Sequence, residues 1–268
     1  MNNRNVINNY DIYRIRNWYY YLGFPVLGYT ISGCTQFKIS IFLTLIIGTS
    51  FALAFVYSLN DFADNDTKKK YFIAPSFFLV LCLFWFRPIG IIALLFFILL
   101  HSCYSLSPFR FKQYPIIGTL CNAIAFPQLF LLGYLNDFYI DIKGIFILVF
   151  LFLSSIVIEL IHEVNHFEQD KVKSDITTAV LFGRKKILTI CSLLLICTIL
   201  TIIAMFLFNV TNIAIMCLLI IFQLIVLINI VYNRRIDYKT WVLYRVSGII
   251  VGSTWFVIEL YKKYSYYK

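Results

Sequence analysis

The sequence predicts an all-α, polytopic membrane protein in which residues 1–268 form a single domain. Hydrophobic residues make up 61% of the chain and charged residues only 13%, and the mean hydropathy is +0.82. Soluble globular domains carry roughly 25% charged residues, so this composition excludes that class. Apolar stretches of about twenty residues recur along the chain, which is the length an α-helix needs to cross a bilayer. The stretches are continuous rather than alternating, which argues against a β-barrel.

The apolar stretches predict nine membrane spans. Arg87-Pro88 separates the third from the fourth, because proline and the residue before it disfavour a continuing helix. No small-residue cleavage site follows the first stretch, so we expect no cleaved signal peptide. The approximate limits of the spans are 18–36, 39–59, 71–87, 88–107, 115–135, 142–162, 187–208, 211–231 and 241–260.

Basic residues predict the orientation of these spans. The net charge is +10, and the Lys and Arg residues sit in short connections and tails, which is typical of the positive-inside rule and not of nucleic-acid binding. We therefore expect a multi-pass protein of a bacterial inner (cytoplasmic) membrane with its N-terminus in the cytoplasm. That orientation places most basic residues inside: Arg4, Arg14, Arg16, Lys68, Lys69, Lys70, Arg110, Lys112, Lys171, Lys173, Arg184, Lys185, Lys186, Arg234, Arg235 and Lys239.

The seven cysteines lie mostly within apolar stretches and have no CxxC spacing. They are expected to be small core residues rather than disulfides or zinc ligands.

A first polar motif follows the second span, with the pattern Asn60-Asp61-x-x-Asp64-x-x-x-Lys68. Asp61 and Asp64 are one helical turn apart, so both carboxylates can grip one cation. Mg²⁺ is commonly held by one or two carboxylates together with substrate phosphates. Asn60 can donate to a phosphate oxygen, and Lys68 would face the same anion. The alternative interpretation is a capped helix end followed by a basic anchor.

A second polar motif follows the sixth span, with the pattern Glu163-x-x-His166-x-x-x-Asp170. These three side chains would share one face if the segment were helical. By itself the segment can equally be a polar loop without a role. Opposite the first motif, it becomes the second half of a site for a metal and a diphosphate.

A third feature ends the fourth span, where Tyr104 is followed by Arg110 and Lys112. The two cations can contact phosphate oxygens, although an ordinary inside anchor has the same composition. Walker A, GxSxG, HExxH and dinucleotide-binding patterns are absent from the sequence.

The chain resembles the UbiA superfamily of intramembrane prenyltransferases over nearly its whole length. The family's first motif, NDxxDxxxD, matches from Asn60 to Asp64, with Lys68 in place of the last Asp. Its second motif, DxxDxxxD, has Glu163 and His166 in place of Asp and retains Asp170. The stretch Thr177-Thr178-Ala179-Val180 with Gly183 follows at the expected distance.

This resemblance implies a bundle of nine transmembrane helices and Mg²⁺-dependent transfer of a prenyl group from a polyprenyl diphosphate to an acceptor that is aromatic, a quinone precursor or a lipid. It implies catalytic roles for Asp61, Asp64 and Asp170, and metal binding by Asp61, Asp64, Glu163 and Asp170. Substrate binding is implied for Asn60, Lys68, Tyr104, Arg110, Lys112 and His166. The expected partners are these substrates and the lipid bilayer, without nucleic acid; the sequence does not indicate an oligomeric state or the acceptor.

Three alternatives stay open at this point. A UbiA-type terpene cyclase would trap the allylic cation within its own substrate. A transporter or lipid-binding protein would use the acidic faces for cations. A non-catalytic member would explain Lys68 and His166 at positions where the family usually has Asp.

Overall fold

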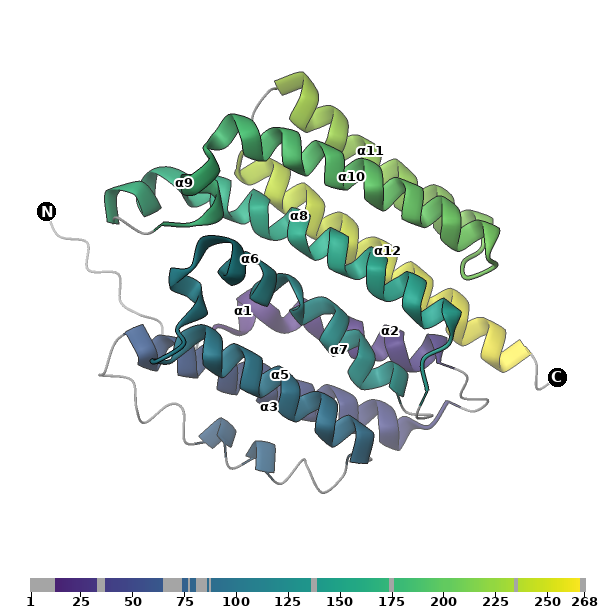
Figure 1. Cartoon of the computed structure of the whole chain (residues 1–268). Coiled ribbons are helices and arrows are strands. Elements are labelled where there is room, and N and C mark those ends of the chain that lie inside the picture. The colour runs from purple at the N-terminus through teal and green to yellow at the C-terminus, as the bar shows by residue number, and fades with distance from the viewer. Residues whose placement is uncertain are drawn as a thin grey trace, which may run out of the picture.

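The computed structural model describes residues 13–32, 37–64, 74–76, 78–80, 86, 88–135, 139–173, 176–233 and 236–265. Lys68 and most of the predicted third span lie outside these residues. Within them, every regular element is helical, and the helices run side by side in one bundle (Figure 1). In chain order the elements are α1 (Ile15–Trp18), η2 (Tyr19–Leu22, a 3-10 turn), α2 (Gly23–Ile31), α3 (Ile39–Asp64), α5 (Pro88–Ser105), η4 (Phe111–Gln113, a 3-10 turn), α6 (Pro115–Ala123), α7 (Ala125–Tyr134), α8 (Ile142–Lys173), α9 (Thr178–Phe182), α10 (Arg184–Leu207), α11 (Ile213–Asn233) and α12 (Tyr238–Ser265).

Seven helical segments of the described chain are long and apolar enough to cross a membrane: α3, α5, the α6–α7 pair, α8, α10, α11 and α12. Each coincides with a predicted span, which confirms a multi-pass helical membrane protein. The first predicted span, 18–36, instead contains η2 and the nine-residue α2, and nine residues rise only about 14 Å. The count of nine spans therefore stays a prediction.

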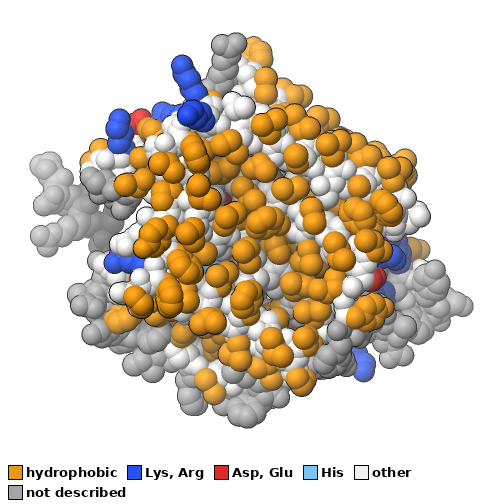
Figure 2. All heavy atoms as spheres, viewed as in Figure 1, with side chains coloured by type: hydrophobic (Ala, Val, Ile, Leu, Met, Phe, Trp, Pro, Cys, Tyr) orange, Lys and Arg blue, Asp and Glu red, His pale blue; other side chains and the backbone are white. Residues whose placement is uncertain are grey.

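The outer surface agrees with a membrane setting. Hydrophobic side chains cover the face seen in Figure 2, and Lys, Arg, Asp and Glu side chains appear near its two ends. Apolar side chains such as Leu99, Leu200 and Ile228 are about three-fifths exposed, which is costly in water but favourable against lipid tails.

Two helices continue past their predicted ends. The apolar stretches end near residues 59 and 162, but α3 continues to Asp64 and α8 continues to Lys173. The interpretation of the second motif as a polar loop is therefore wrong, because Glu163, His166 and Asp170 all lie on α8. Hydropathy reports where a helix leaves lipid, and helical hydrogen bonding does not have to stop there.

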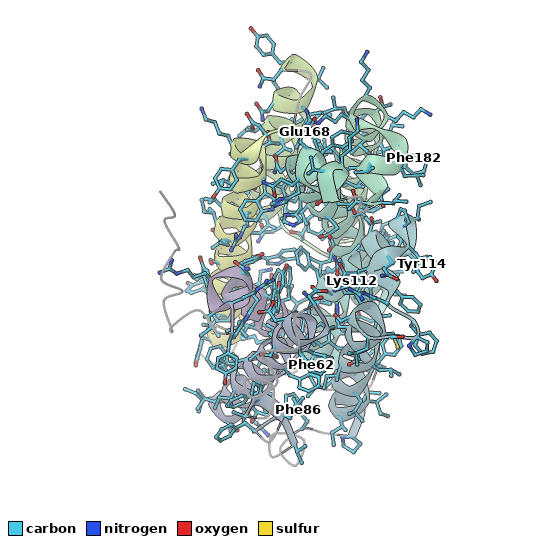
Figure 3. All side chains as sticks on the ribbon, turned by 90° about the vertical axis from the view of Figure 1, so that its left-hand side faces the viewer. Phe62, Phe86, Lys112, Tyr114, Glu168 and Phe182 are labelled. Atoms are coloured by element: carbon cyan, nitrogen blue, oxygen red, sulfur yellow. The ribbon has the colours of Figure 1, made fainter. Side chains whose placement is uncertain are left out.

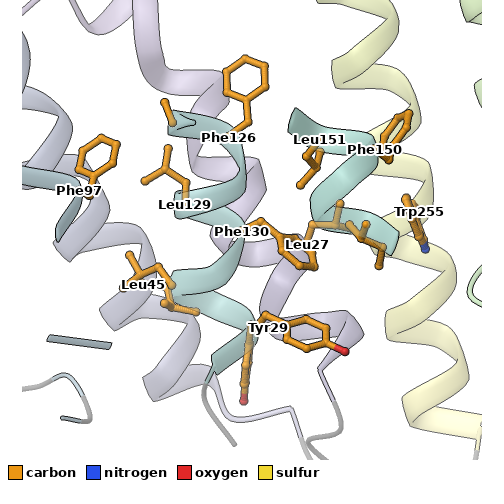
Figure 4. Packing of buried hydrophobic residues seen from close by; sticks show 14 of the residues in the cluster. Leu27, Tyr29, Leu45, Phe97, Phe126, Leu129, Phe130, Phe150, Leu151 and Trp255 are labelled. Carbon is orange, nitrogen blue, oxygen red and sulfur yellow. The ribbon is translucent and has the colours of Figure 1, made fainter. Parts of the chain in front are cut away.

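The core is tightest where α2 packs against α7. A Cβ atom added to Gly28 would lie 2.1 Å from the Phe130 carbonyl oxygen, and one added to Gly133 would lie 1.9 Å from the Pro25 carbonyl oxygen. Glycine is required at both positions because the two backbones touch, as in small-residue interfaces of membrane helices. The fully buried Tyr29 and Phe130 fill the space beside this contact (Figure 4).

The predicted fifth span is broken between α6 and α7 at Ile124. Pro127 explains the break, because it has no N–H to donate to the Ala123 carbonyl and its ring crowds that oxygen. On the two sides of the break, α6 contacts α8 and α9, and α7 contacts α2 and α8.

Candidate functional site

The two polar motifs lie at the same end of the bundle. The last turns of α3 and α8 both reach the left-hand end of Figure 1, together with the start of α12. A cavity of about 700 Å³ opens between these helices, and it is lined by both polar and aromatic side chains. Figure 3 looks onto this end and shows Phe62 and Lys112 on the side of α3 and α5, with Glu168 on the opposite side.

The first wall of the cavity combines the end of α3 with the segment after α5. Asn60 Oδ1 accepts hydrogen bonds from Ser105 Oγ at 3.1 Å and from Lys112 Nζ at 3.2 Å. Asp64 Oδ1 pairs with Arg110 at 3.2 Å and also with Lys112 Nζ. Arg110 has a left-handed backbone with φ of 37°, and η4 follows it directly. This tight turn brings the two predicted phosphate-binding cations back onto the first motif.

Asp61 is the buried carboxylate of the same motif, with 4% of its surface exposed. Arg14, from the segment before α1, places its guanidinium 2.8 Å from Asp61 Oδ1. Arg14 and Asn17 also line the cavity. The N-terminal segment therefore forms part of the site, which the motif spacing does not indicate.

The second wall is α8, where Glu159, His162 and His166 line the cavity at successive turns. The two imidazole rings are 4.6 Å apart between centroids. Glu159 Oε1 accepts a hydrogen bond from Asn122 Nδ2 at 2.6 Å, and the same Asn122 amide lies 3.2 Å from the Tyr104 hydroxyl. The predicted residues Tyr104 and His166 thus share the cavity with Asn60.

Glu163 faces away from this polar space, into the contact between α6, α8 and α9. It is 8% exposed, and its Oε2 accepts the Ala179 N–H at 2.8 Å while its Oε1 accepts from the Thr119 hydroxyl. Thr119 also bonds Thr178. Both carboxylate oxygens are engaged by protein donors, so Glu163 fixes the start of α9 against α6.

The four carboxylates predicted to bind metal do not form one compact site in this structure. Among the described residues, no three His, Cys, Asp or Glu side chains lie close enough to hold a metal ion. Asp170 lies near the end of α8, two turns beyond Glu163. Asp61, Asp64 and Asn60 supply oxygen donors on one turn of α3, which suits Mg²⁺ that takes its other ligands from phosphate and water.

The third wall is α12, where Trp241 and Arg245 line the cavity. The Arg245 guanidinium lies over the ring of Tyr20 at 3.9 Å and over the ring of Trp241 at 4.7 Å. It also donates to the Arg16 carbonyl oxygen at 2.9 Å. The N-terminal segment is therefore held at two points, by Arg14 on α3 and by Arg245 on α12.

A second, mostly apolar cavity of about 420 Å³ lies between α2, α8, α11 and α12. It shares Tyr20, Phe126, Ile158 and Arg245 with the polar cavity, so the two are adjacent. Phe24, Phe222 and Trp255 contribute to its walls. The site thus joins a charged entrance to an apolar interior.

Sequence reasoning did not identify several cavity residues. Arg14 and His162 were not assigned a role, and Asn122, Glu159 and Arg245 were not distinguished from other polar residues near spans. His101 was also missed; it is 6% exposed and stacks against Phe97 with ring centroids 4.5 Å apart. An ionisable residue within a predicted span is the signal that would have singled out Glu159, His101 and Arg245.

A family model described as the UbiA prenyltransferase family matches residues 69–249. No curated protein matches the chain by sequence.

Solved structures share the fold. A UbiA homolog from Archaeoglobus fulgidus bound to GPP and Mg²⁺ is similar with a TM-score of 0.77 at 19% identity, over 93% of this chain and 96% of that one. An apo UbiA homolog from Aeropyrum pernix K1 has a TM-score of 0.76 at 12% identity, over 92% and 99% of the two chains. A digeranylgeranylglyceryl phosphate synthase structure has a TM-score of 0.71 at 16% identity, over 93% and 96%.

Proposed function

Because the chain belongs to the UbiA prenyltransferase family, we propose that it transfers a prenyl group from a polyprenyl diphosphate to an acceptor in the membrane. The observation that carries this proposal is the cluster of Asn60, Asp61 and Asp64 with Arg110 and Lys112, in which Asn60 lines a cavity with polar and aromatic walls. Neighbouring carboxylates and cations suit a ligand that binds as a metal–diphosphate complex. The carboxylates bind the metal, and the cations bind the phosphate oxygens.

The donor's diphosphate would bind at the first wall. Asp61 and Asp64 would hold Mg²⁺, with Asp170 reaching toward the same complex from α8. The bound ion would neutralise charge on the leaving diphosphate. Arg110 and Lys112 would move from Asp64 onto phosphate oxygens, and Asn60 would donate its amide N–H. Lys68 would add charge from the segment after α3. Glu163 would act by supporting α9.

The prenyl chain would extend from the polar cavity into the apolar one. Phe126 and Ile158 line both cavities, so an apolar chain passing between them stays in contact with apolar side chains. Tyr20, Tyr21, Tyr57 and Tyr104 line the polar cavity, and their ring faces suit the allylic cation.

The proposed reaction breaks the bond between the prenyl C1 and the diphosphate oxygen, and the electron pair leaves with diphosphate. The acceptor's nucleophilic atom then bonds to C1 and releases its proton to solvent or diphosphate. The residues Asn60, Arg110 and Lys112 contribute by stabilising negative charge on the leaving group in a site shielded from bulk water.

We also propose that the end carrying both motifs faces the cytoplasm. At this end, the segment after α5 carries Arg110 and Lys112, α8 carries Lys171 near its end, and α10 begins with Arg184, Lys185 and Lys186. Such an excess of basic residues is typical of cytoplasmic connections.

The test is mass spectrometry of products after the purified protein is incubated with geranyl diphosphate or longer prenyl diphosphates, Mg²⁺ and a pool of acceptors, with and without EDTA. We expect an acceptor heavier by one prenyl group, together with free diphosphate, only when Mg²⁺ is present. Diphosphate release with a cyclised hydrocarbon and no acceptor would identify a terpene cyclase. Absence of diphosphate release with every donor would contradict both enzymatic functions.

A further inference from the structure

We propose that Arg245 binds an anionic group of the acceptor, a carboxylate or a phosphate, at the α12 side of the cavity. This proposal rests on the proposed prenyl transfer and narrows its second substrate to an acid. The evidence for the proposal is the position, the charge and the surroundings of the Arg245 side chain.

The Arg245 side chain is held in place before any ligand arrives. Its guanidinium lies over the Tyr20 and Trp241 rings, at 3.9 Å and 4.7 Å from their centroids. One NH2 group donates to the Arg16 carbonyl oxygen at 2.9 Å. A guanidinium has five N–H donors in a planar fork that matches the oxygens of a carboxylate or phosphate. Two aromatic contacts and one backbone hydrogen bond fix that fork and leave donors for a ligand.

In the described part of the chain, Arg245 forms no ion pair with a carboxylate, although Glu159 lines the same cavity. The ion pairs there join Arg14 to Asp61, Arg110 and Lys112 to Asp64, Arg184 to Glu168, and Lys262 to Glu259. Arg245 lies within α12, a helix apolar enough to span the membrane. A charged side chain in such a helix is costly and typically faces a cavity where it meets a partner or a ligand.

Arg245 belongs to a different helix from the groups that we propose for the diphosphate. The groups that suit diphosphate belong to α3, η4 and the segment after α5, whereas α12 packs against α2, α8 and α11. Arg245 is the only cationic residue among those lining both cavities in the described chain. It therefore stands at the junction of the cavities, where the prenyl carbon would meet the acceptor.

The surroundings of Arg245 suit a ring or other flat body attached to the anion. Tyr20, Trp241 and His162 line the polar cavity on this side, and the His162 and Trp241 rings are 6.3 Å apart between centroids. Glu159 lies on the same α8 wall but is bonded to Asn122 at 2.6 Å, so a carboxylate acceptor is best placed toward α12. A neutral acceptor would leave the guanidinium without an anion.

The experiment measures acceptor and donor binding separately in the full-length protein in detergent. The acceptor probes are two matched pairs, 4-hydroxybenzoate with its methyl ester and glycerol 1-phosphate with glycerol. They are titrated in the presence of Mg²⁺ and an uncleavable geranyl thiodiphosphate. The variants are Arg245→Gln and Arg245→Lys. The matched control is Arg184→Gln, which removes another arginine that lies over an aromatic ring, Phe167 at 4.8 Å, away from the residues lining the cavity.

We expect the wild-type protein to bind one of the two anions at least tenfold more tightly than its neutral counterpart, and the pair that does so identifies carboxylate or phosphate. Arg245→Gln should raise the Kd of that anion about 10- to 100-fold, the scale of losing a charged hydrogen-bond partner. Arg245→Lys should recover part of the loss, and Arg184→Gln should change nothing. Donor Kd should change less than threefold in every variant.

Equal binding of acid and neutral counterpart, or binding of neither anion, would overturn the proposal while donor binding still supports prenyl transfer. A loss of donor affinity in Arg245→Gln with unchanged anion affinity would reassign Arg245 to the diphosphate, which also overturns it. A wild-type protein that binds no prenyl diphosphate would instead contradict the proposed function. If Arg245→Gln does not fold, the wild-type preference and the Arg245→Lys titration decide the matter.

Discussion

Arg14 and Asp61 form an ion pair of 2.8 Å between the N-terminal segment and the first acidic motif. The Asp61 carboxyl group is almost fully buried, whereas the Arg14 side chain is 42% exposed. The arginine therefore lies on the cavity side of a carboxylate that we propose as a metal ligand. A cation at this position competes with Mg²⁺ for the same oxygen and can transfer to the diphosphate when the metal complex arrives.

This competition predicts the effect of Arg14→Gln on metal binding. The variant keeps a hydrogen-bonding side chain but removes the positive charge, so Mg²⁺ meets less competition at Asp61. Thermal unfolding followed during Mg²⁺ titration, without substrate, should show a lower half-saturating Mg²⁺ concentration than the wild type. Arg16→Gln removes a neighbouring charge and serves as the control, because the Arg16 contact with Arg245 is made by its backbone carbonyl oxygen and is kept in the variant. An unchanged midpoint in Arg14→Gln would mean that the metal does not use Asp61.

Asp64→Asn tests the second carboxylate of the same turn. The change is nearly isosteric at a half-exposed helix end, where Asp64 is 40% exposed, so the fold and the melting temperature should be retained. Turnover should fall about 100- to 1000-fold, the scale of losing one main electrostatic stabiliser of the transition state. Glu168→Gln removes another ion-paired, more exposed carboxylate and should leave turnover unchanged. A stable and fully active Asp64→Asn protein would place the metal elsewhere.

Glu163 provides a test that separates support from metal binding. Glu163→Ala leaves the Ala179 N–H without its acceptor and removes one of the hydrogen bonds of the Thr119 hydroxyl, which should cost about 1 to 3 kcal/mol of stability. Glu163→Gln keeps one carbonyl oxygen and should retain more stability, with turnover within about tenfold of wild type, far less affected than in Asp64→Asn. Melting temperature and prenyl transfer are measured on the same preparations. If Glu163→Gln lowers turnover as much as Asp64→Asn does, without a change in stability, then Glu163 is a metal ligand.

The glycine contact between α2 and α7 predicts that Gly→Ala substitutions at two positions differ in their effect on stability. Gly133→Ala would place a methyl group 1.9 Å from the Pro25 carbonyl oxygen, so the helices must separate and we expect a loss of about 1 to 3 kcal/mol or more. At Gly252, on α12, a Cβ meets nothing within 4 Å. Gly252→Ala should leave stability unchanged or raise it by up to about 1 kcal/mol through helix propensity. Equal melting temperatures for the two variants would show that α2 and α7 are not in backbone contact.

Much of the bundle could be predicted from the sequence because lipid imposes one requirement, a long apolar helix, that hydropathy reads directly. All seven helical segments that could span the membrane coincide with predicted spans. The ends of α3 and α8 could not be read in this way. Beyond Leu59 and His162, the helices continue, and their polar side chains face a cavity or another helix. Composition alone does not distinguish such a polar helical segment from a polar loop.

The candidate site was predictable only where its residues are near one another in the chain. Asp61 and Asp64 lie one turn apart, so their spacing predicts a shared face. Arg14 approaches Asp61, and Arg245 approaches Tyr20, only through the packing of helices that are distant in sequence. Glu163 is the opposite case. Its spacing from Asp170 predicts a shared site, but its carboxylate accepts hydrogen bonds from Thr119 on α6 and Ala179 on α9.

The backbone contact between α2 and α7, which requires Gly28 and Gly133, has a consequence for the biogenesis of this protein. A ribosome that adds 5 to 20 residues per second makes the second glycine roughly 5 to 20 seconds after the first, because about a hundred residues separate them. During that interval the short α2 has no α7 to pack against, although α3 can already enter the bilayer. The packing of α2 is therefore completed only after α7 has been made. The Arg14 ion pair needs only α3, so the N-terminal segment can be attached to Asp61 before α2 finds its glycine partner.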